Sequence, residues 1–401
     1  MTTIGELAPP KQLLLTSGPS SMDPRVYHAI AKSLVSHMDP WFATAMTEVQ
    51  ALLRAVFQTQ NRITYPISSS GSGGIEASVV NPLEEGDEAL ICVNGMFSDR
   101  IAVIAERTPA KVTRLEVPYG KTVDPDDVRR AGKGKKIKIV ALTHGETSSG
   151  VIQDIDGFRK VADELGALLV VDTVATLSAV PLDVDRERID ICFSASQKAL
   201  SAPPGLAPIT VSTRAEEAIR ARKTKVLSWY FDLRAAMDYW GKDRLYHHTP
   251  PIMLIYALHE ALRIVLEEGL EARWVRHRQN QQALIAGLEA MGLELLVKNP
   301  AERLPTVTAV KVPEGVDDAK VRGRLLQEFN IEISGGLGLM KNKIWRVGLL
   351  GHSSQRPHVL RFLEILEKVL LGQGYHAAAG TGVAAAVHSY AQAETPDTVV
   401  K

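Results

Sequence analysis

Short apolar runs alternate with amphipathic, helix-length segments through the first half of this chain, and that alternation constrains the fold more than any other feature. Segments such as 97–107 and 155–165 fit helices that cross over between neighbouring strands. Strands that alternate with helices indicate an α/β fold with a mostly parallel sheet. The strands that we expect are at 89–93, 111–116, 137–142, 168–172, 189–193 and 207–211.

Length and composition are compatible with two domains. A chain of 401 residues with 45% hydrophobic content can bury one large core and a second, smaller one. After Pro251 the pattern becomes long and helical, with Gly269 as the expected break between two helices, and further strands are expected near 307–312 and 343–349. We predict an N-terminal arm at 1–20, a large coenzyme-binding domain at 21–268 and a small C-terminal domain at 269–375.

The two ends of the chain carry no recognised signal. The opening string MTTIGELAPPKQ lacks the charged and apolar regions of a signal peptide, and the final Val399-Val400-Lys401 is not a peroxisomal signal. We therefore expect a cytoplasmic protein. Residues 376–401 are rich in Ala, Gly, Thr and Ser and show no core pattern, so we expect a disordered tail there.

Charge and cysteine content argue against several classes of partner. The 46 basic residues balance 46 acidic residues, so neither nucleic acid nor a membrane surface is expected as a partner. Cys92 and Cys192 each lie in an apolar run. We interpret both as small buried hydrophobic residues rather than as a disulfide or a metal site, and we expect no metal.

The clearest chemical signal is the pair formed by Asp172 and Lys198. Asp172 ends the apolar strand expected at 168–172, and Lys198 follows one crossover later in the string SASQKAL. A pyridoxal phosphate enzyme needs a carboxylate for the ring nitrogen and an amine for the Schiff base. Taken singly, Asp172 could cap a helix and Lys198 could be a solvated surface charge. Together, with apolar runs before them, they favour an enzyme that uses pyridoxal phosphate.

A Ser- and Gly-rich loop, SSSGSGG at 68–74, leads directly into an apolar-periodic helix start. Such a loop exposes backbone N–H groups and hydroxyls at a helix N-terminus, which suits the phosphate of a coenzyme. The string is neither a Walker loop nor a dinucleotide fingerprint. By itself it is more often an ordinary flexible turn.

Five strings carry a resemblance to a known family, and they lie in the family's order across roughly residues 10–370. They are THGETSSGV (143–151), VVDTVATL (170–177), SQKALSAPPG (196–205), RLYHHT (244–249) and WRVGLLG (345–351). The chain resembles the class V aminotransferases of fold type I, and within them the alanine–glyoxylate and serine–pyruvate aminotransferases. The resemblance implies a mostly parallel seven-stranded sheet between helices, a smaller C-terminal α/β domain, and pyridoxal phosphate as the coenzyme.

The resemblance also implies roles for individual residues at the coenzyme. Lys198 would form the Schiff base, Asp172 would face the ring nitrogen, Phe97 would stack on the ring, and Thr147 would bond the 3′ oxygen. Without the resemblance, Phe97 would be an ordinary core aromatic and Thr147 a turn or cap residue. The residues expected at the phosphate are Ser70, Gly71, Ser72 and Gln197, joined by Tyr246 and Thr249 from the neighbouring subunit. The implied assembly is a homodimer with shared active sites.

Arg346 is the residue that we expect to bind the substrate. It interrupts an apolar strand, and a buried guanidinium must find an anion. The sequence leaves open an ion pair with a core acid. The resemblance assigns Arg346 instead to the substrate α-carboxylate, over which the turn containing Gly18 would close. His37 and Trp41 lie where the family sets side-chain selectivity, but the sequence indicates no role for them.

These expectations indicate a transaminase that moves the amino group of alanine or serine to a small oxoacid, glyoxylate or pyruvate, with ping-pong kinetics. Lys198 would carry the α-proton as base and then acid. One alternative is a different small donor such as (S)-ureidoglycine, although such enzymes are expected to carry an insertion where ARKTKVLSWYFDL runs uninterrupted. Another is a non-catalytic coenzyme-binding protein. A cysteine desulfurase is excluded because no cysteine follows Cys192.

Overall fold

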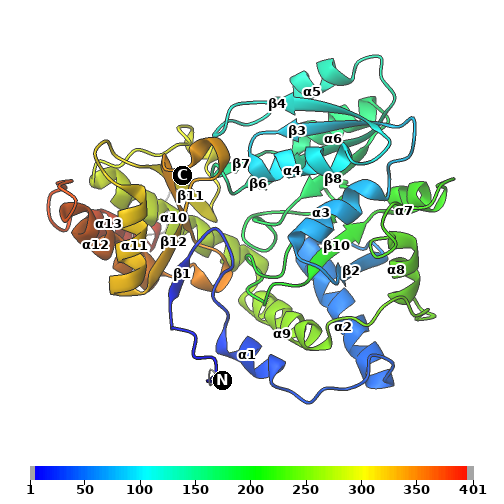
Figure 1. Ribbon diagram of the computed structural model, residues 1–401, viewed down its shortest axis with the longest axis horizontal. Helices are drawn as coiled ribbons and strands as arrows, with labels where there is room; N and C mark the ends of the chain where they lie inside the picture. The colour runs from blue at the N-terminus through cyan, green and yellow to red at the C-terminus, as the bar shows by residue number, and fades with distance from the viewer. Residues whose placement is uncertain (1–4, 395–401) are drawn as a thin grey trace, which may run out of the picture.

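The computed structural model describes residues 5–394 and has two halves, each with its own sheet and hydrophobic core (Figure 1). The larger half contains a seven-stranded sheet, and the smaller half contains a four-stranded sheet. A small third sheet, formed by β6 (Gly145–Glu146) and β7 (Val151–Ile152), is a two-stranded hairpin. The expected α/β fold with a mostly parallel seven-stranded sheet is confirmed.

The strands of the large sheet form a nearly parallel array in which only β10 runs against its neighbours. In spatial order they are β2 (Ile63–Ile67), β10 (Ala207–Val211), β9 (Ile191–Phe193), β8 (Leu168–Asp172), β5 (Ile137–Thr143), β3 (Glu88–Val93) and β4 (Lys111–Glu116). The six strands expected from the apolar runs are therefore all present.

Strand β2 was not predicted, because Pro66 interrupts its apolar run. Proline is tolerated in edge strands, where no ladder hydrogen bond needs its missing N–H. In the structure β2 is at the edge of the sheet, and Pro66 faces Pro208 of β10. Two residues without an N–H group thus oppose each other in the register.

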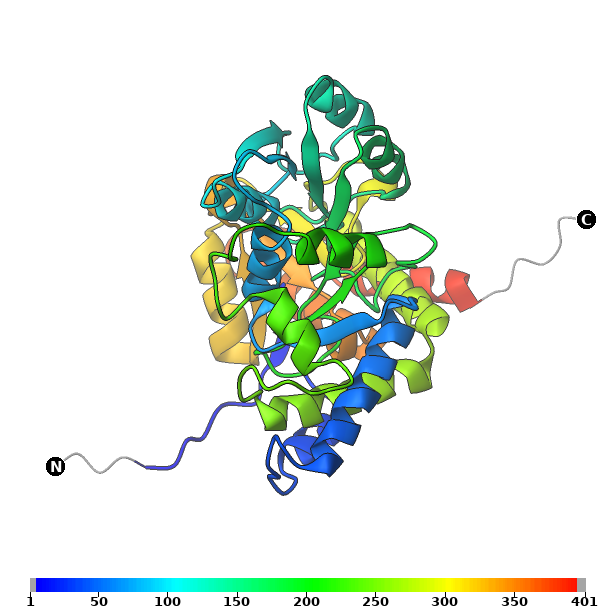
Figure 2. The same cartoon turned by 90° about the vertical axis from the view of Figure 1, so that its right-hand side faces the viewer.

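Helices cover the large sheet and include the two predicted crossover helices. These two are α4 (Met96–Ala105) and α6 (Asp156–Glu164). The others in this half are α1 (Pro24–Ile30), α2 (Pro40–Phe57), α3 (Gly71–Val80), α5 (Pro125–Gly132), α7 (Thr213–Arg220), α8 (Leu233–Tyr239) and α9 (Ile252–Glu268). Helices α2 (blue) and α9 (yellow-green) pack side by side (Figure 2).

The smaller half includes a strand from the beginning of the chain. Its sheet has the order β1 (Leu13–Leu15), β12 (Ile331–Gly335), β13 (Ile344–Gly348) and β11 (Val307–Lys311). Leu13 pairs in parallel with Ile331, so part of the expected N-terminal arm is an edge strand of the second sheet. Helices α10 (Leu270–Ala290), α11 (Asp318–Phe329) and α12 (Arg356–Leu371) belong to this half.

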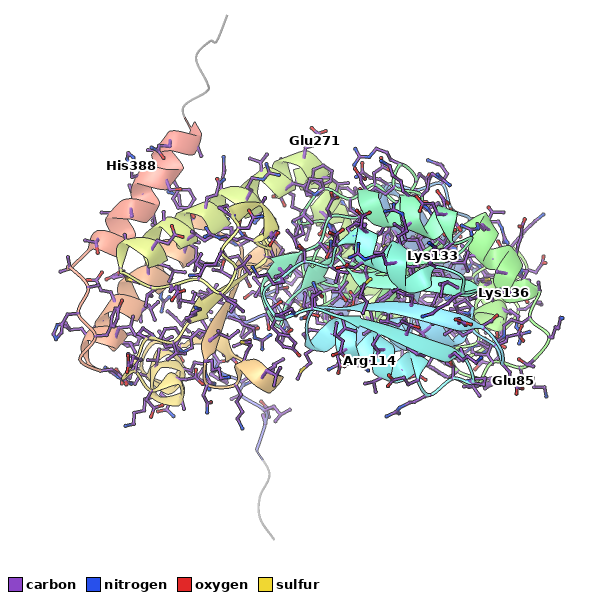
Figure 3. The ribbon with its side chains drawn as sticks, turned by 90° about the horizontal axis from the view of Figure 1, so that it is seen from above. Glu85, Arg114, Lys133, Lys136, Glu271 and His388 are labelled. Carbon is purple, nitrogen blue, oxygen red and sulfur yellow. The ribbon has the colours of Figure 1, made fainter. Side chains whose placement is uncertain are left out.

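The expectation of a disordered tail from residue 376 is wrong for the last helix, α13 (Thr381–Glu394). Alanine has the highest helix propensity, and small side chains can still bury one face. Ala386 and Tyr390 are buried in the second core, and the Tyr390 hydroxyl donates to Asn280 Oδ1 of α10 at 2.7 Å. Helix α13, labelled at His388, lies against α10 at the far end of the smaller half (Figure 3). Residues 395–401 lie outside the described part.

Among residues 5–394, no helix is both long enough and apolar enough to cross a bilayer.

Candidate active site

Most of the predicted coenzyme residues gather in one cavity at the carboxyl ends of the parallel strands. Ligands of open α/β sheets bind at this edge, because the loops that follow the strands meet there. Strand β8 contributes Asp172, and the loop after β9 contributes Lys198. The predicted residues that line the cavity are Ser70, Gly71, Ser72, Phe97, Thr147, Asp172, Gln197 and Lys198. Arg100, which the sequence did not single out, also lines it.

Asp172 is buried and forms no ion pair among residues 5–394, although the charges of Lys198 and Arg100 act on it. Only 2% of its surface is exposed, and Oδ1 accepts a hydrogen bond from the Val174 N–H at 2.8 Å. Burial raises the pKa of Asp172 to about 7, and that backbone hydrogen bond offsets part of the effect. A cationic partner would restore the ionised form. A protonated ring nitrogen is such a partner.

Lys198 is buried in the same cavity and has an unusually acidic ammonium group. Burial and the nearby charge of Arg346 lower its pKa to about 8, and Asp172 offsets part of that shift. Its Nζ donates to the backbone carbonyl of Ser17. A lysine with this pKa supplies a substantial fraction of neutral, nucleophilic amine near neutral pH.

Gly18 lies directly against the Lys198 side chain. A Cβ at Gly18 would lie 2.6 Å from Lys198 Cδ, and the backbone of Gly18 has φ of +119°. Both the contact and the left-handed backbone require glycine at this position. The turn predicted to close over the substrate therefore lies beside the lysine.

The Ser- and Gly-rich loop forms the first turn of α3, with Ser70 as the N-cap residue. Its side chain makes no capping hydrogen bond, so backbone N–H groups of the first turn stay available to a ligand. Gln197 Oε1 and Thr143 Oγ1, in residues that line the same cavity, are buried and have no hydrogen-bond partner among residues 5–394. Unpaired backbone donors at the loop and unpaired buried polar atoms in the cavity fit a polar ligand that bears a phosphate.

The residues of the cavity thus fit pyridoxal phosphate. Lys198 offers an amine of lowered pKa, Asp172 offers a carboxyl group that needs a cation, and the loop at Ser70 offers anion-binding donors. Phe97 is half-buried and contributes an aromatic ring to the same cavity.

A buried carboxylate that the sequence did not single out, Glu146, holds Phe97 and Thr147 in place. Glu146 Oε2 accepts from the N–H groups of Phe97 at 3.1 Å and Ser98 at 2.9 Å, and Oε1 accepts from Ser148 N–H at 2.9 Å. It therefore satisfies free donors at the start of α4, where acidic groups are favoured. Thr147 lies between Glu146 and Ser148 in the chain. The hydrogen bonds of Glu146 therefore hold the loop that contains Thr147 against α4, the helix that carries Phe97.

Arg346 projects from β13 and is only 4% exposed, yet no carboxylate among residues 5–394 lies within ion-pair distance. Nε donates to the Gly335 carbonyl at 2.8 Å, and Nη1 donates to Ser17 Oγ at 2.9 Å and to the Thr147 carbonyl at 3.1 Å. Nη2 has no hydrogen-bond partner in the described part of the chain. Burial lowers the pKa of Arg346 to about 10. The alternative of a core ion pair is therefore not observed.

Tyr246 and Thr249 do not line the cavity of their own chain. The Tyr246 side chain is 56% exposed, and its hydroxyl lies 3.2 Å from Thr249 Oγ1. His37 packs near the ring of Tyr246, with centroids 5.3 Å apart. Trp41 is exposed and packs edge-on against Tyr256. These residues lie toward the surface and do not line the cavity of their own subunit.

Comparison with known proteins identifies the class to which these features correspond. The aminotransferase class-V family model matches residues 23–349. The chain is 40% identical to the (S)-ureidoglycine–glyoxylate transaminase of Bacillus subtilis over 97% of both chains, and 40% identical to the alanine–glyoxylate aminotransferase of Felis catus over 91% of this chain and 89% of that one.

Solved structures of the same two kinds of aminotransferase superpose closely on this chain. A ureidoglycine–glyoxylate aminotransferase from Bacillus subtilis superposes with a TM-score of 0.94 at 42% identity, covering 96% of this chain and 100% of that chain. An alanine–glyoxylate aminotransferase from Nostoc sp. superposes with a TM-score of 0.90 at 43% identity, covering 92% and 97%. Both kinds of relative match at nearly equal identity, so overall likeness does not distinguish their donors.

Proposed function

The chain belongs to the class-V aminotransferases, which are pyridoxal phosphate enzymes, and from that premise we propose that it transfers the amino group of alanine or serine to glyoxylate, with pyruvate as a second acceptor. The observation that carries this proposal is the arrangement of Lys198, Asp172 and Arg346. The first two line one cavity, and the charge of Arg346 acts on the lysine. An amine, an acid and a carboxylate anchor are the groups that transamination of an α-amino acid requires.

Each residue has a distinct task in the proposed mechanism. When bound, pyridoxal phosphate supplies an electron-withdrawing ring that stabilises negative charge at the substrate α-carbon. Lys198, with its lowered pKa, removes the α-proton as a base and returns a proton as an acid. Asp172 would hold the ring nitrogen and stabilise its positive charge. Arg346 binds the α-carboxylate through Nη2 and so orients the α-hydrogen toward the lysine.

The proposal also names the amino donor. Alanine and serine have small side chains that need no further charged partner, and several alanine–glyoxylate aminotransferases match about nine-tenths of the chain. (S)-Ureidoglycine is the alternative, because a relative named for that donor matches 97% of both chains. A non-catalytic coenzyme-binding protein is not supported, because the amine, the acid and the anchor are all present.

Half-reactions with single amino acids test the donor. Each of alanine, serine and (S)-ureidoglycine is mixed with the holoenzyme without an oxoacid, and loss of the visible absorbance of the bound coenzyme is followed in a stopped-flow instrument. Alanine or serine should give the largest kcat/KM, and glyoxylate should restore the absorbance. Rapid loss with (S)-ureidoglycine alone would replace the proposed donor while leaving the transaminase assignment intact.

We also propose that the enzyme is a homodimer with shared active sites. Five large apolar side chains are exposed in the segment 227–246, and large apolar surfaces that are exposed often mark protein–protein interfaces. They are Leu227, Trp229, Tyr230, Leu245 and Tyr246. Tyr246 and Thr249 of each subunit would then reach the coenzyme phosphate of its neighbour. The expected cytoplasmic location stays a prediction.

A further inference from the structure

The cavity contains an arginine, Arg100, to which no pattern in the sequence assigned a role. We infer that Arg100 is a phosphate-binding residue of the coenzyme site and supplies the positive charge that the loop at Ser70–Ser72 lacks. This inference rests on the proposed position of the coenzyme phosphate at that loop.

The position of Arg100 joins two parts of the coenzyme site. It lies one helical turn after Phe97 on α4, and its guanidinium carbon is 5.1 Å from the centroid of the Phe97 ring. Its Nη1 donates to Ser72 Oγ in the first turn of α3 at 3.0 Å. The guanidinium therefore lies between the expected stacking residue and the expected phosphate loop.

Arg100 has no ion-pair partner within residues 5–394, although acids lie near it. The neighbouring Asp99 is bound by Arg114, which lies on the outer edge of the large half (Figure 3). Glu146 already accepts hydrogen bonds from backbone N–H groups with both oxygens. The charge of Arg100 is thus available to an anion that enters the cavity.

The loop itself needs such a charge. Its string SSSGSGG contains no basic residue, and a helix N-terminus contributes only about half an elementary charge. A phosphate monoester carries roughly 1.5 to 2 negative charges near neutral pH. The helix terminus therefore leaves most of the ligand charge uncompensated, and Arg100 is the arginine that lines the cavity.

The hydrogen bond from Arg100 to Ser72 also affects the serine hydroxyl. Because Ser72 Oγ accepts from Arg100, its own hydrogen can be donated to another acceptor. A hydroxyl polarised by a cation is a stronger donor. Arg100 thereby prepares Ser72 to donate to a phosphate oxygen while it adds its own charge to the site.

A simpler role for Arg100 would be to pack on Phe97 through a cation–π contact, without acting on the phosphate. The two roles differ in the part of the ligand that they affect. Packing on Phe97 would act through the coenzyme ring. A phosphate role requires the phosphate group and is lost when the ligand lacks it.

The test measures dissociation constants of the full-length enzyme, freed of coenzyme, for pyridoxal phosphate and for pyridoxal, which carries a hydroxyl in place of the phosphate. The variants are Arg100→Met, which keeps an apolar side chain over Phe97, and Arg100→Lys, which keeps the charge. Arg107→Met is the matched control, since Arg107 is exposed just beyond the end of α4. Thermal unfolding of each protein without ligand checks that it is folded.

We expect Arg100→Met to weaken binding of pyridoxal phosphate by about ten- to a hundredfold, the loss typical of a charge-assisted hydrogen bond, and to leave binding of pyridoxal within about twofold. Arg100→Lys should recover part of the affinity, and Arg107→Met should match the unmodified enzyme. Added sodium chloride should weaken pyridoxal phosphate binding less in Arg100→Met than in the unmodified enzyme.

Equal losses for both ligands, or no loss for either, would overturn the phosphate role of Arg100. If the unmodified enzyme failed to bind pyridoxal phosphate, the proposed coenzyme site itself would be wrong. The comparison between unmodified enzyme and variant therefore separates the two failures.

Discussion

Arg346 Nη1 lies 2.9 Å from Ser17 Oγ, and the same Ser17 accepts a hydrogen bond from Lys198 Nζ through its carbonyl oxygen. One residue near the start of the chain therefore contacts both the proposed substrate anchor and the proposed proton carrier. Because Ser17 lies two residues after β1, the edge strand of the second sheet, its position depends on the contact between the two halves. The active site thus forms only when both halves are folded together.

The first prediction concerns Lys198. Lys198→Ala should fold and bind coenzyme without a covalent bond, and its transamination rate should fall by several orders of magnitude because the nucleophile and proton carrier is lost. Borohydride reduction of the unmodified holoenzyme, followed by peptide mapping, should label Lys198. A label on any other lysine would contradict the assignment.

The second prediction concerns stability and pH. Burial raises the pKa of Asp172 to about 7 in the coenzyme-free protein, whereas an aspartate in an unfolded chain has a pKa of about 4. The folded state therefore keeps a proton that the unfolded state releases between these values, so stability falls as pH rises from about 4 to 7. Asp172→Asn cannot lose this proton.

Urea unfolding of both coenzyme-free proteins across that pH range isolates the contribution of Asp172. The unmodified protein should lose up to about 4 kcal/mol more than Asp172→Asn as pH rises, from a pKa difference of about three units. Bound pyridoxal phosphate should reduce this difference, because its ring nitrogen stabilises the carboxylate. Parallel stability curves for the two coenzyme-free proteins would show that Asp172 is ionised in the folded state.

The third prediction tests the shared site by mixing two inactive proteins. Lys198→Ala lacks the amine, and a variant with Tyr246→Ala and Thr249→Ala lacks the phosphate donors proposed for the neighbour. Random exchange of subunits makes about half of the dimers mixed, and each mixed dimer regains one intact site, so activity should return to roughly a quarter of the unmodified level. The mixture is assayed after dilution, incubation and reconcentration.

Two controls complete the experiment. A mixture of Lys198→Ala with Asp172→Asn is the negative control. Both residues line the cavity of one chain, so each site of a mixed dimer keeps one defect and no activity should return. Sedimentation velocity should show that all variants are dimers. No recovery with the first pair, although subunits exchange, would mean that each site is built from a single chain.

The sequence predicted those parts of the site that depend on local pattern. Asp172 ends an apolar strand, and strand ends of a parallel sheet meet at one edge, so its position near Lys198 follows from the fold class. Glu146 and Arg100 could not be found in this way. Glu146 acts on the start of α4, and Arg100 acts on the start of α3, so each role exists only once two segments are packed together.

The same limit applies to the smaller half. Strand β1 is three residues long, and the partner of Leu13 is Ile331, far away in the sequence, so no local signal indicated the pairing. Helix α13 was mistaken for a disordered tail because its buried face is made mainly of small residues, with Tyr390 as the large one. A helical reading of the spacing between Val383, Ala386 and Tyr390 would have indicated an apolar face.

The last prediction concerns Arg346. Its hydrogen bonds go to neutral oxygens of Gly335, Ser17 and Thr147, and no acid among residues 5–394 forms an ion pair with it, although the charge of Glu146 acts on it. We therefore expect its main effect in substrate binding. Loss of the charge-assisted contact between Nη2 and the α-carboxylate should lower kcat/KM by about 1.5 to 3 kcal/mol, roughly ten- to two-hundred-fold, in Arg346→Ala.

The loss should be similar for alanine and serine, and it should be absent for an amine that lacks the carboxylate, because only the carboxylate contacts Arg346. Arg346→Lys keeps the charge but cannot donate to Gly335, Ser17, Thr147 and the carboxylate at the same time, so it should recover only part of the activity. Steady-state kinetics and the denaturant midpoint are measured on the same coenzyme-loaded preparations. If Arg346→Ala kept near-normal kcat/KM for alanine and serine while its unfolding midpoint fell sharply, Arg346 would be a structural residue, and the α-carboxylate would have to bind elsewhere in the cavity.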